Sequence, residues 1–378
     1  MTTIKIFIKT FFIVSTLFLS NTYAQQQVPF TELETDRHHV SAIAFSPDGK
    51  TLAIGYDQSI RLVDIESNET IHTLQGNQEI TGEIVFSPNG KFIASGDNKN
   101  VRVWRTKNGN RFKNFKGHNK PVSCVAFSSD GKYLASGDTD GTGGNESIRI
   151  WELKAEEEPL LLMLPNPPKN TWQVQQLFFM PKSDVLIASH LGHSTLRFWD
   201  IQTGELFKQV DTGTNTMHAI AFSADWKRFV YGAHLGMQWW DVENEALISD
   251  VVGPFYFNSI DDHNLEGRLD YFFRDIDLSP DEKTIVATQL ETVVELWDAT
   301  DTAREPITVL EGHKGKVMHV AFSPDGCLVA SADSKGIVRL WEVRDILADQ
   351  EVNEVSEDIN GDGTVNIQDL VTVANAFR

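Results

Sequence analysis

The sequence predicts an all-β fold built from seven copies of one four-stranded unit. A short apolar run ends seven times on a large apolar residue, at Phe45, Phe86, Phe127, Phe179, Phe222, Leu278 and Phe322. A second run closes 18 to 24 residues later, at Val63, Trp104, Trp151, Trp199, Trp240, Trp297 and Trp341. A period of about 41 residues with these two markers is typical of sheets that repeat around an axis. We therefore expect a seven-bladed β-propeller.

The third repeat contains the residues expected of each strand and turn in a blade. Residues 122–127 are largely apolar, as expected of an inner strand enclosed between neighbouring blades. Residues 128–131 then supply Asp and Gly for a tight turn. Residues 133–136 and 147–152 follow as the second and third strands. A fourth strand comes after a turn that contains Gly or Asn, such as Thr203-Gly204 in the next repeat.

Short motifs within the repeats resemble those of the WD-repeat family. They include Phe-Ser-Pro-Asp-Gly-Lys at 45–50, Leu-Ala-Ser-Gly at 134–137 and Ile-Arg-Ile-Trp-Glu at 148–152. Gly117-His118 and Gly312-His313 match the Gly-His element of that family. The resemblance implies the propeller fold and, in complete blades, a hydrogen-bonded tetrad of His, Asp, Ser and Trp.

The resemblance covers about residues 28–344, and its departures predict incomplete tetrads in most blades. The aspartate expected six residues before the tryptophan is present only as Asp57. The equivalent positions in the other blades are Asn98, Asn145, His193, His234, Glu291 and Lys335. Such blades are expected to rely more on packing.

The ring is expected to close through its N-terminal strand. No good fourth strand follows Trp341, whereas residues 28–33 resemble the outer-strand segment 306–310 that precedes Gly312-His313. A strand from residues 28–33 would complete the last blade and remove an open sheet edge. The propeller is therefore expected to span residues 25–345.

Three insertions interrupt the repeat, at 138–146, about 165–172 and about 253–273. In up-and-down blades all three emerge on one face, over blades 3 to 6. Long loops on a rigid scaffold often carry binding residues. The candidates are Trp172, Phe255, Tyr256, Phe257, His263 and Tyr271.

Aromatic residues of this kind can hold a protein partner or stack on sugar rings. Two other interpretations stay open. The aromatic residues could fold inward as a plug over neighbouring strands, or Phe272-Phe273 could simply start the sixth blade. His218 and His319 lie in inner strands and are expected to be core or channel histidines.

The insertion also raises the question of catalysis. Asp261, Asp262 and His263 could serve in acid–base chemistry or bind a metal, but adjacent residues rarely converge on one ion. The chain contains no nucleophile elbow, phosphate loop or zinc-spaced Cys/His set. The sequence therefore favours a non-catalytic interaction scaffold that binds a protein or glycan. A hydrolase-like enzyme that uses the 253–273 loop and a structural subunit of a cell-surface assembly are the alternatives.

The N-terminus resembles a secretory signal peptide over residues 1–24. Lys5 and Lys9 supply positive charge before the mostly apolar stretch 10–19, and Thr22-Tyr23-Ala24 provides small residues for cleavage. We expect a secreted, periplasmic or cell-surface protein with no membrane span after cleavage. Its net charge of −20 argues against nucleic acid and anionic lipid as partners. Cys124 and Cys327 lie in blades that are not neighbours, which predicts two buried free thiols.

The tail carries a second motif after an acidic linker at 346–357. Residues 358–369 have the spacing of a calcium loop, with Gly363 at the sharp turn. The expected ligands are Asp358, Asn360, Asp362, Thr364 through its carbonyl, Asn366 and Asp369. A single apolar-faced helix, 367–377, follows. The segment 358–378 resembles one dockerin repeat, and the whole chain a secreted bacterial WD-repeat protein. Dockerins carry two such repeats and bind cohesin, so the resemblance implies calcium as cofactor and a cohesin-like or other exported anchoring partner.

Overall fold

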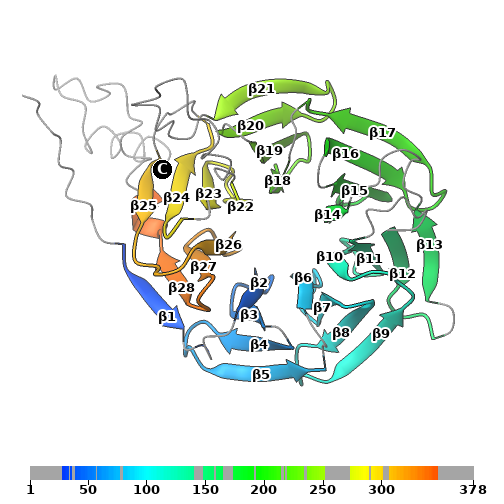
Figure 1. Ribbon diagram of the computed structural model, residues 1–378, viewed down its shortest axis with the longest axis horizontal. Helices are drawn as coiled ribbons and strands as arrows, with labels where there is room; N and C mark the ends of the chain where they lie inside the picture. The colour runs from blue at the N-terminus through cyan, green and yellow to red at the C-terminus, as the bar shows by residue number, and fades with distance from the viewer. Residues whose placement is uncertain are drawn as a thin grey trace, which may run out of the picture.

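Seven four-stranded antiparallel sheets surround a central axis (Figure 1). This computed structural model describes residues 28–347, except 34, 36–38, 57, 77–79, 140–147, 157–158, 165–172, 191–192, 214–216, 218, 234–235, 252–272, 289–290 and 301–305. The sheets are the blades of a propeller, so the predicted fold class is confirmed. The described part ends in one helical turn, residues 344–347.

Each blade is numbered by its place in the chain, and its strands run from the axis outward. Blade 1 contains β2 (Val40–Phe45), β3 (Thr51–Tyr56), β4 (Ser59–Asp64) and β5 (Thr70–Gln75). Blade 2 contains β6 (Ile80–Phe86), β7 (Phe92–Asp97), β8 (Asn100–Arg105) and β9 (Arg111–Lys116). Blade 3 contains β10 (Val122–Phe127), β11 (Tyr133–Asp138), β12 (Ile148–Glu152) and β13 (Leu160–Leu164).

The remaining blades repeat this order. Blade 4 contains β14 (Val174–Phe179), β15 (Val185–His190), β16 (His193–Asp200) and β17 (Leu206–Asp211). Blade 5 contains β18 (Ile220–Phe222), β19 (Arg228–Ala233), β20 (Gly236–Asp241) and β21 (Ala246–Val251). Blade 6 contains β22 (Asp275–Leu278), β23 (Thr284–Thr288), β24 (Val294–Asp298) and β25 (Thr308–Leu310). Blade 7 contains β26 (Val317–Phe322), β27 (Leu328–Asp333), β28 (Val338–Glu342) and β1 (Phe30–Leu33).

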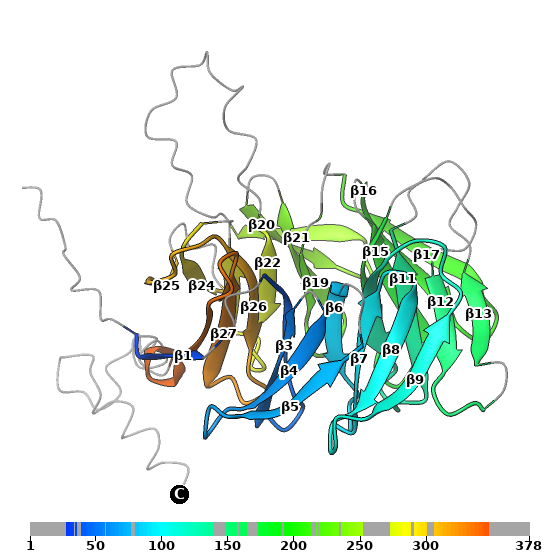
Figure 2. The same ribbon diagram turned by 60° about the horizontal axis from the view of Figure 1, so that its bottom comes forward.

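The connections between strands define two faces of the ring. Turns between the first and second strands, and between the third and fourth, lie on one side, which we name the hairpin face. The β4–β5 and β8–β9 turns lie at its edge, at the bottom of Figure 2. The other connections lie on the opposite side, which we name the insertion face. The described strands that flank the three predicted insertions end on this face, β11 and β12, β13 and β14, and β21 and β22.

The turn between the first two strands explains the recurring Ser-Pro-Asp-Gly motif. In blade 1 the Ser46 hydroxyl donates to Asp48 Oδ1 at 2.6 Å, and the Lys50 amide donates to the same oxygen at 3.1 Å. Both hydrogen bonds lower the pKa of Asp48, and the bond from Ser46 has the larger effect. Gly49 has φ of +69°, which favours glycine. The motif is therefore a turn that specifies the hairpin.

Blade-to-blade packing forms the core. The closing tryptophans Trp104, Trp151, Trp199, Trp297 and Trp341 are among the largest fully buried side chains. Trp199 of blade 4 packs in one cluster with Ile148 and Leu164 of blade 3, so each such cluster joins two neighbouring blades. Phe273 is buried between blades 5 and 6 beside Gly232, which confirms that it serves the sixth blade rather than an exposed loop.

The N-terminal strand closes the ring as predicted. β1 pairs antiparallel with β28, with Phe30 opposite Trp341 and Leu33 opposite Val338. The two strands lie side by side in Figure 1, where β1 is blue and β28 orange. Arg339 on β28 pairs with Glu32 at 3.1 Å and lies over the Phe30 ring, 4.2 Å from its centroid. Closure thus combines backbone pairing, an ion pair and ring packing.

The structure corrects the predicted position of the tetrad aspartate. In blade 7, Trp341 Nε1 donates to Ser331 Oγ at 2.8 Å, and Ser331 lies 2.7 Å from His313 Nε2. His313 Nδ1 lies 3.0 Å from Asp333. The acid is thus Asp333, two residues after the serine, and not the residue six before the tryptophan, Lys335.

Blade 3 contains the same complete tetrad, His118, Asp138, Ser136 and Trp151. Both histidines belong to the two Gly-His elements. Burial lowers the pKa of His118 and of His313 more than their aspartates raise it, so both rings are neutral near pH 7. A neutral ring donates from Nδ1 to the carboxylate and accepts the serine proton at Nε2. Asp57, which the sequence pattern selected, lies outside the described residues.

The two cysteines are free, as expected, but only one is buried. Cys124 is on β10, whereas Cys327 is in the turn before β27 and is partly exposed. The expectation of two buried thiols is therefore wrong for Cys327, because this residue follows the Asp-Gly turn and precedes the strand. Among the described residues, no helix has the length and apolar character that a bilayer span requires.

Candidate functional site

The predicted binding and metal residues lie outside the described part of the chain. This applies to Trp172, Phe255, Tyr256, Phe257, His263 and Tyr271, and to the calcium candidates Asp358, Asn360, Asp362, Thr364, Asn366 and Asp369. It applies equally to the signal peptide 1–24, to the segment 358–378, to Asp261, Asp262 and His218, and to most of the linker 346–357. These assignments stay predictions. Three surfaces of the described propeller remain as candidates for function.

The first candidate is an acidic cluster at the axis. Glu83 on β6 hydrogen-bonds Gln176 on β14 and interacts electrostatically with Asp275 on β22. These strands belong to blades 2, 4 and 6, so the interactions reach across the propeller axis. Burial raises the pKa of Glu83 to about 8, the Asp275 charge adds to the rise, and the Gln176 bond opposes it. His319 Nδ1 lies 3.7 Å from Asp275 Oδ2, so this histidine of blade 7 contacts a carboxylate of blade 6.

Part of this cluster joins blades 6 and 7. Asp275 accepts the Val320 amide at 3.0 Å, and Asp277 accepts the Phe322 amide at 2.8 Å. Burial raises the pKa of Asp277 to about 7, against the lowering effect of its backbone hydrogen bonds. Raised carboxyl pKa values often mark functional sites. Here both aspartates instead connect β22 to β26, which assigns them a structural role.

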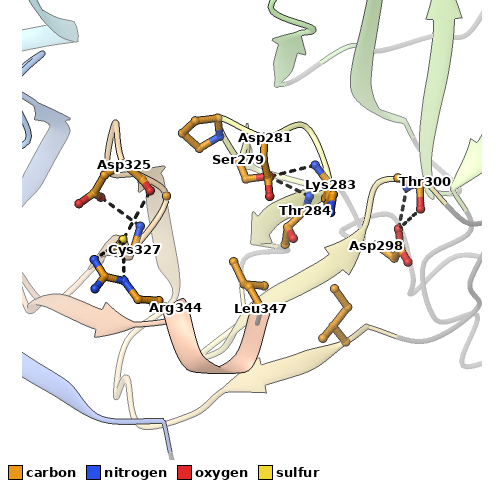
Figure 3. Close-up of a pocket in the computed structure, with 13 residues that line it drawn as sticks. Ser279, Asp281, Lys283, Thr284, Asp298, Thr300, Asp325, Cys327, Arg344 and Leu347 are labelled. Atoms are coloured by element: carbon orange, nitrogen blue, oxygen red, sulfur yellow. Dashed lines mark hydrogen bonds between the residues drawn. The ribbon is translucent and has the colours of Figure 1, made fainter. Parts of the chain in front are cut away.

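The second candidate is a cavity of about 580 Å³ on the hairpin face between blades 6 and 7 (Figure 3). Turn residues of both blades line it, and Arg344 and Leu347 of the final helical turn border it. Its carboxylates already have partners: Asp281 accepts the Lys283 amide, and Asp325 accepts the Cys327 amide. The cavity therefore lies along the contact between blades 6 and 7, and the hydrogen bonds of its carboxylates assign them to the turns rather than to a ligand.

One contact in this cavity stands apart. The guanidinium of Arg344 lies 2.7 and 2.9 Å from the sulfur of Cys327, which raises the pKa of Arg344. The contact ties the last helical turn to blade 7. Within the described residues, no group of three or more His, Cys, Asp or Glu side chains is placed to hold a metal ion.

The third candidate is a set of exposed apolar side chains on the outer circumference. Six of the large exposed apolar residues are on the outer strands of blades 3, 4 and 5; we name them the apolar rim: Leu160, Leu161, Met163, Phe207, Leu247 and Ile248. These strands follow one another around the ring in Figure 1. Outer strands alternate between packed and exposed residues, so the sequence pattern alone did not separate this sector from the others.

Comparison with known proteins agrees with the geometry. The WD domain, G-beta repeat family model matches residues 68–105, 109–152 and 304–342, and the anaphase-promoting complex subunit 4 WD40 domain model matches residues 20–82. These matches fall on blades 1, 2, 3 and 7 and on the outer strand of blade 6.

Relatives match only parts of the chain. Serine-threonine kinase receptor-associated protein of Dictyostelium discoideum is 28% identical over 53% of this chain and 61% of its own length. WD repeat-containing protein SL1-17 of Schistosoma mansoni is 30% identical over 42% of this chain and 48% of its own length. Ribosome assembly protein 4 of Chaetomium thermophilum is 43% identical over 16% of this chain and 12% of its own. The chain thus spans less than two thirds of each of these curated relatives. With its seven closed sheets and its matched repeats, the chain is a seven-bladed β-propeller with WD40 repeats.

Proposed function

We propose that the protein is a secreted, non-catalytic scaffold that binds a partner protein through its propeller. The observation that carries this proposal is the apolar rim. Exposed apolar side chains that gather on one sector, rather than scattering singly, are typical of protein contact surfaces. Among the described residues, Ile71 on blade 1 is the one large exposed apolar residue outside this sector.

The three blades that carry the apolar rim contact one another. A Cβ placed on Gly204 of blade 4 would lie 3.4 Å from Leu162 of blade 3, so the two blades touch there. Lys208 of blade 4 lies 3.4 Å from Glu245 of blade 5. These contacts hold the outer strands β13, β17 and β21 of the three blades next to one another. A partner could therefore bury their apolar side chains together.

The predicted aromatic insertions attach to the same sector of the ring, blades 3 to 6. In this proposal Trp172, Phe255, Tyr256, Phe257, His263 and Tyr271 extend the contact surface toward a protein or glycan. A rigid ring with long loops on one face suits such binding. One relative is named as a receptor-associated protein, which supports a binding role.

The tail supplies the attachment in this proposal. Asp358, Asn360 and Asp362 with Thr364, Asn366 and Asp369 would bind calcium and order the segment 358–378. The ordered segment would then dock on another exported component. The signal-like residues 1–24 would direct the chain to the secreted, periplasmic or cell-surface location where that component resides.

A pair of substitutions on the rim tests the scaffold proposal. Phe207→Asp with Leu247→Asp places two charges on the apolar surface, and Ile71→Asp with Thr73→Asp is the matched control on blade 1. We expect the wild type and the control to capture the same proteins from the exported proteome. The rim variant should retain them at least about tenfold less, because hot-spot residues often contribute more than about 1 kcal/mol each. Equal capture by all three, at equal thermal stability, would show that the rim is not the binding surface.

The same capture assay examines the tail. Removing residues 346–378 should leave rim-dependent partners in place and remove those held by the tail. A truncated chain that captures the full set of proteins would refute attachment through residues 358–378.

A further inference from the structure

Blade 2 carries a basic segment in an acidic protein. The whole chain has 53 Asp and Glu against 33 Lys and Arg. Residues 98–129 contain no Asp or Glu. The same stretch contains eight cations, Lys99, Arg102, Arg105, Lys107, Arg111, Lys113, Lys116 and Lys120. The local charge of blade 2 is thus opposite in sign to that of the chain.

On the hairpin face, blade 2 differs from the other blades at positions where most of them carry an acid. In six blades the residue after the closing position is acidic, namely Asp64, Glu152, Asp200, Asp241, Asp298 and Glu342. Blade 2 has Arg105 there. Blade 2 also has Asn89 where the turns of five blades have Asp. Both positions face solvent at the same end of the blade.

Folding does not require this change of charge. Asn89 accepts the Ser87 hydroxyl at 2.9 Å and the Lys91 amide at 3.0 Å, as Asp48 does from Ser46 and Lys50. The turn keeps its hydrogen bonds and loses only the negative charge. A neutral turn with unchanged geometry points to a function for the charge rather than for the fold.

The backbone brings four exposed cations to one place, which we name the basic edge: Lys91, Arg105, Lys107 and Arg111. The Thr106 amide donates to the Lys91 carbonyl at 3.1 Å, which places Lys91 beside the β8–β9 turn. Trp104, which precedes Arg105, pairs with Arg111 across the two strands. Among the described residues, no carboxylate lies within salt-bridge distance of these four side chains. Their charge is available to a partner.

An aromatic ring positions one of these cations. The Arg105 guanidinium lies over the Phe112 ring, 4.3 Å from its centroid, and Phe112 packs against Phe92 with centroids 4.7 Å apart. Stacking on a supported ring limits the side-chain freedom of Arg105. Less conformational entropy is then lost when a carboxylate binds the guanidinium.

The surroundings restrict the size of the partner. On the hairpin face, blade 1 presents Asp64 and Glu66, and blade 3 presents Asp130 and Glu152. An anion wider than blade 2 would meet these charges and be repelled. A duplex nucleic acid is such an anion, whereas a short carboxylate-rich segment can stay on blade 2.

We propose that the basic edge binds a short Asp/Glu-rich segment of a partner protein. The proposal rests on the scaffold function and adds a second surface to it, away from the apolar rim. It specifies the chemistry of that partner: several carboxylates in an extended segment, which pair with the guanidinium groups of Arg105 and Arg111 and with the two lysines.

The test uses the full chain and a fluorescently labelled peptide of eight glutamates. Arg105→Asp, Lys107→Glu and Arg111→Glu are combined in one variant; the first change installs the acid that six other blades carry. The matched control combines Lys99→Glu, Lys116→Glu and Lys120→Glu, on the insertion face of the same blade, with the same change in net charge. Fluorescence anisotropy measures the peptide affinity of each protein at low salt and at a salt concentration about tenfold higher.

We expect the basic-edge variant to bind the peptide at least about tenfold more weakly than the wild type, and the control less than about threefold more weakly. High salt should weaken the wild-type complex, since the contacts are exposed. Equal losses in both variants, or no binding by the wild type, would overturn the proposal. A DNA duplex that displaces the peptide with higher affinity would reassign the surface to nucleic acid, and self-association lost in the variant would reassign it to a second copy. The basic-edge variant should still capture the proteins that bind through the apolar rim. Failure of the basic-edge proposal can therefore be distinguished from failure of the scaffold proposal.

Discussion

The ring of Phe30 packs against that of Trp341, with centroids 4.9 Å apart, so the first described strand of the chain is joined to the last. The two residues are also paired across β1 and β28. Val28 and Leu33 on either side of Phe30 are buried. The ends of the propeller are therefore held by packing as well as by backbone hydrogen bonds, and the strength of this closure can be measured.

Replacing Phe30 should weaken the ring closure. Phe30→Ala removes the contact with Trp341 and the ring beneath Arg339. For a partly buried aromatic residue we expect the free energy of unfolding to fall by about 2 kcal/mol. Urea unfolding followed by tryptophan fluorescence measures this change. Thr31→Ala, an exposed neighbour on β1, should change the stability by less than about 0.5 kcal/mol. Equal effects of the two substitutions would contradict closure by ring packing.

The tetrad of blade 7 should be sensitive to loss of its serine. Ser331→Ala leaves the indole N–H of Trp341 and the Nε2 atom of His313 without their buried partner. An unsatisfied buried polar group costs about 1–3 kcal/mol, so we expect a loss of about 2 kcal/mol.

The equivalent serine of blade 4 is the control for this prediction. Among the described residues, Ser189 accepts one longer bond, 3.2 Å, from the backbone amide of Gln176, and Trp199 Nε1 has no hydrogen-bond partner. Ser189→Ala should therefore cost less than Ser331→Ala in thermal unfolding. A larger loss in blade 4 would show that the tetrad is not what stabilises blade 7.

Glu83→Gln should stabilise the protein at alkaline pH. Burial and Asp275 raise the folded-state pKa of Glu83 to about 8, above its ordinary value of 4.5. Between these values the unfolded chain releases the proton while the folded chain keeps it, so wild-type stability falls as pH rises from about 4.5 to about 8. The substituted amide carries no charge in either the folded or the unfolded state. We expect the variant to gain about 2 kcal/mol at pH 8, after allowance for the partial exposure of Glu83 to solvent, and almost nothing at pH 4.

Thermal unfolding between pH 4 and pH 9 checks this prediction, with the exposed Glu69→Gln as the control. The difference between Glu83→Gln and the wild type should grow with pH, and by more than that between the control and the wild type. A difference that is the same at every pH would mean that folding does not raise the pKa of Glu83.

Calcium should bind the tail with a measurable heat. Calorimetry on the full chain is expected to show one calcium site, and Asp358→Ala, which removes the first ligand of the predicted loop, should weaken it at least about tenfold. Asp349→Ala, an acidic residue of the linker, is the matched control and should leave the affinity unchanged. Absence of calcium heat in the wild type would refute the metal site.

Some features of the structure could be predicted because they depend on residues close together in the chain. The turn at Ser46–Lys50 needs a hydrogen-bond acceptor and a glycine at fixed positions, and both can be recognised in the sequence. The closing strand was predicted at 28–33 from its likeness to segment 306–310, and it is observed at 30–33. The tetrad acid was assigned wrongly because its distance from Trp151 or Trp341 includes a loop. Asp138 and Asp333 instead have a constant offset from the serine on the same strand, and counting from Ser136 or Ser331 would have found them.

The candidate surfaces were less accessible to prediction. The inserted loops could be recognised as breaks in the repeat. Their candidate binding residues lie outside the described part of the chain, so the roles assigned to them stay predictions. An acidic residue such as Glu83 within an apolar inner strand was a signal that sequence reasoning did not use. The apolar rim had no such signal, since an exposed Leu247 and a buried Val251 occur in the same outer strand.

The sequence by itself determined the seven blades, their order and the strand that closes them, because periodicity, turn residues and strand burial are local properties. Only the tertiary structure decided which distant residues meet. Glu83 and Asp275 approach one another because closure of the ring brings inner strands from opposite blades to one axis. Likewise, Lys91 joins Arg105 and Arg111 at one edge because the β8–β9 turn returns to the start of β7. Such proximity depends on the curvature and closure of the whole ring, which no single repeat encodes.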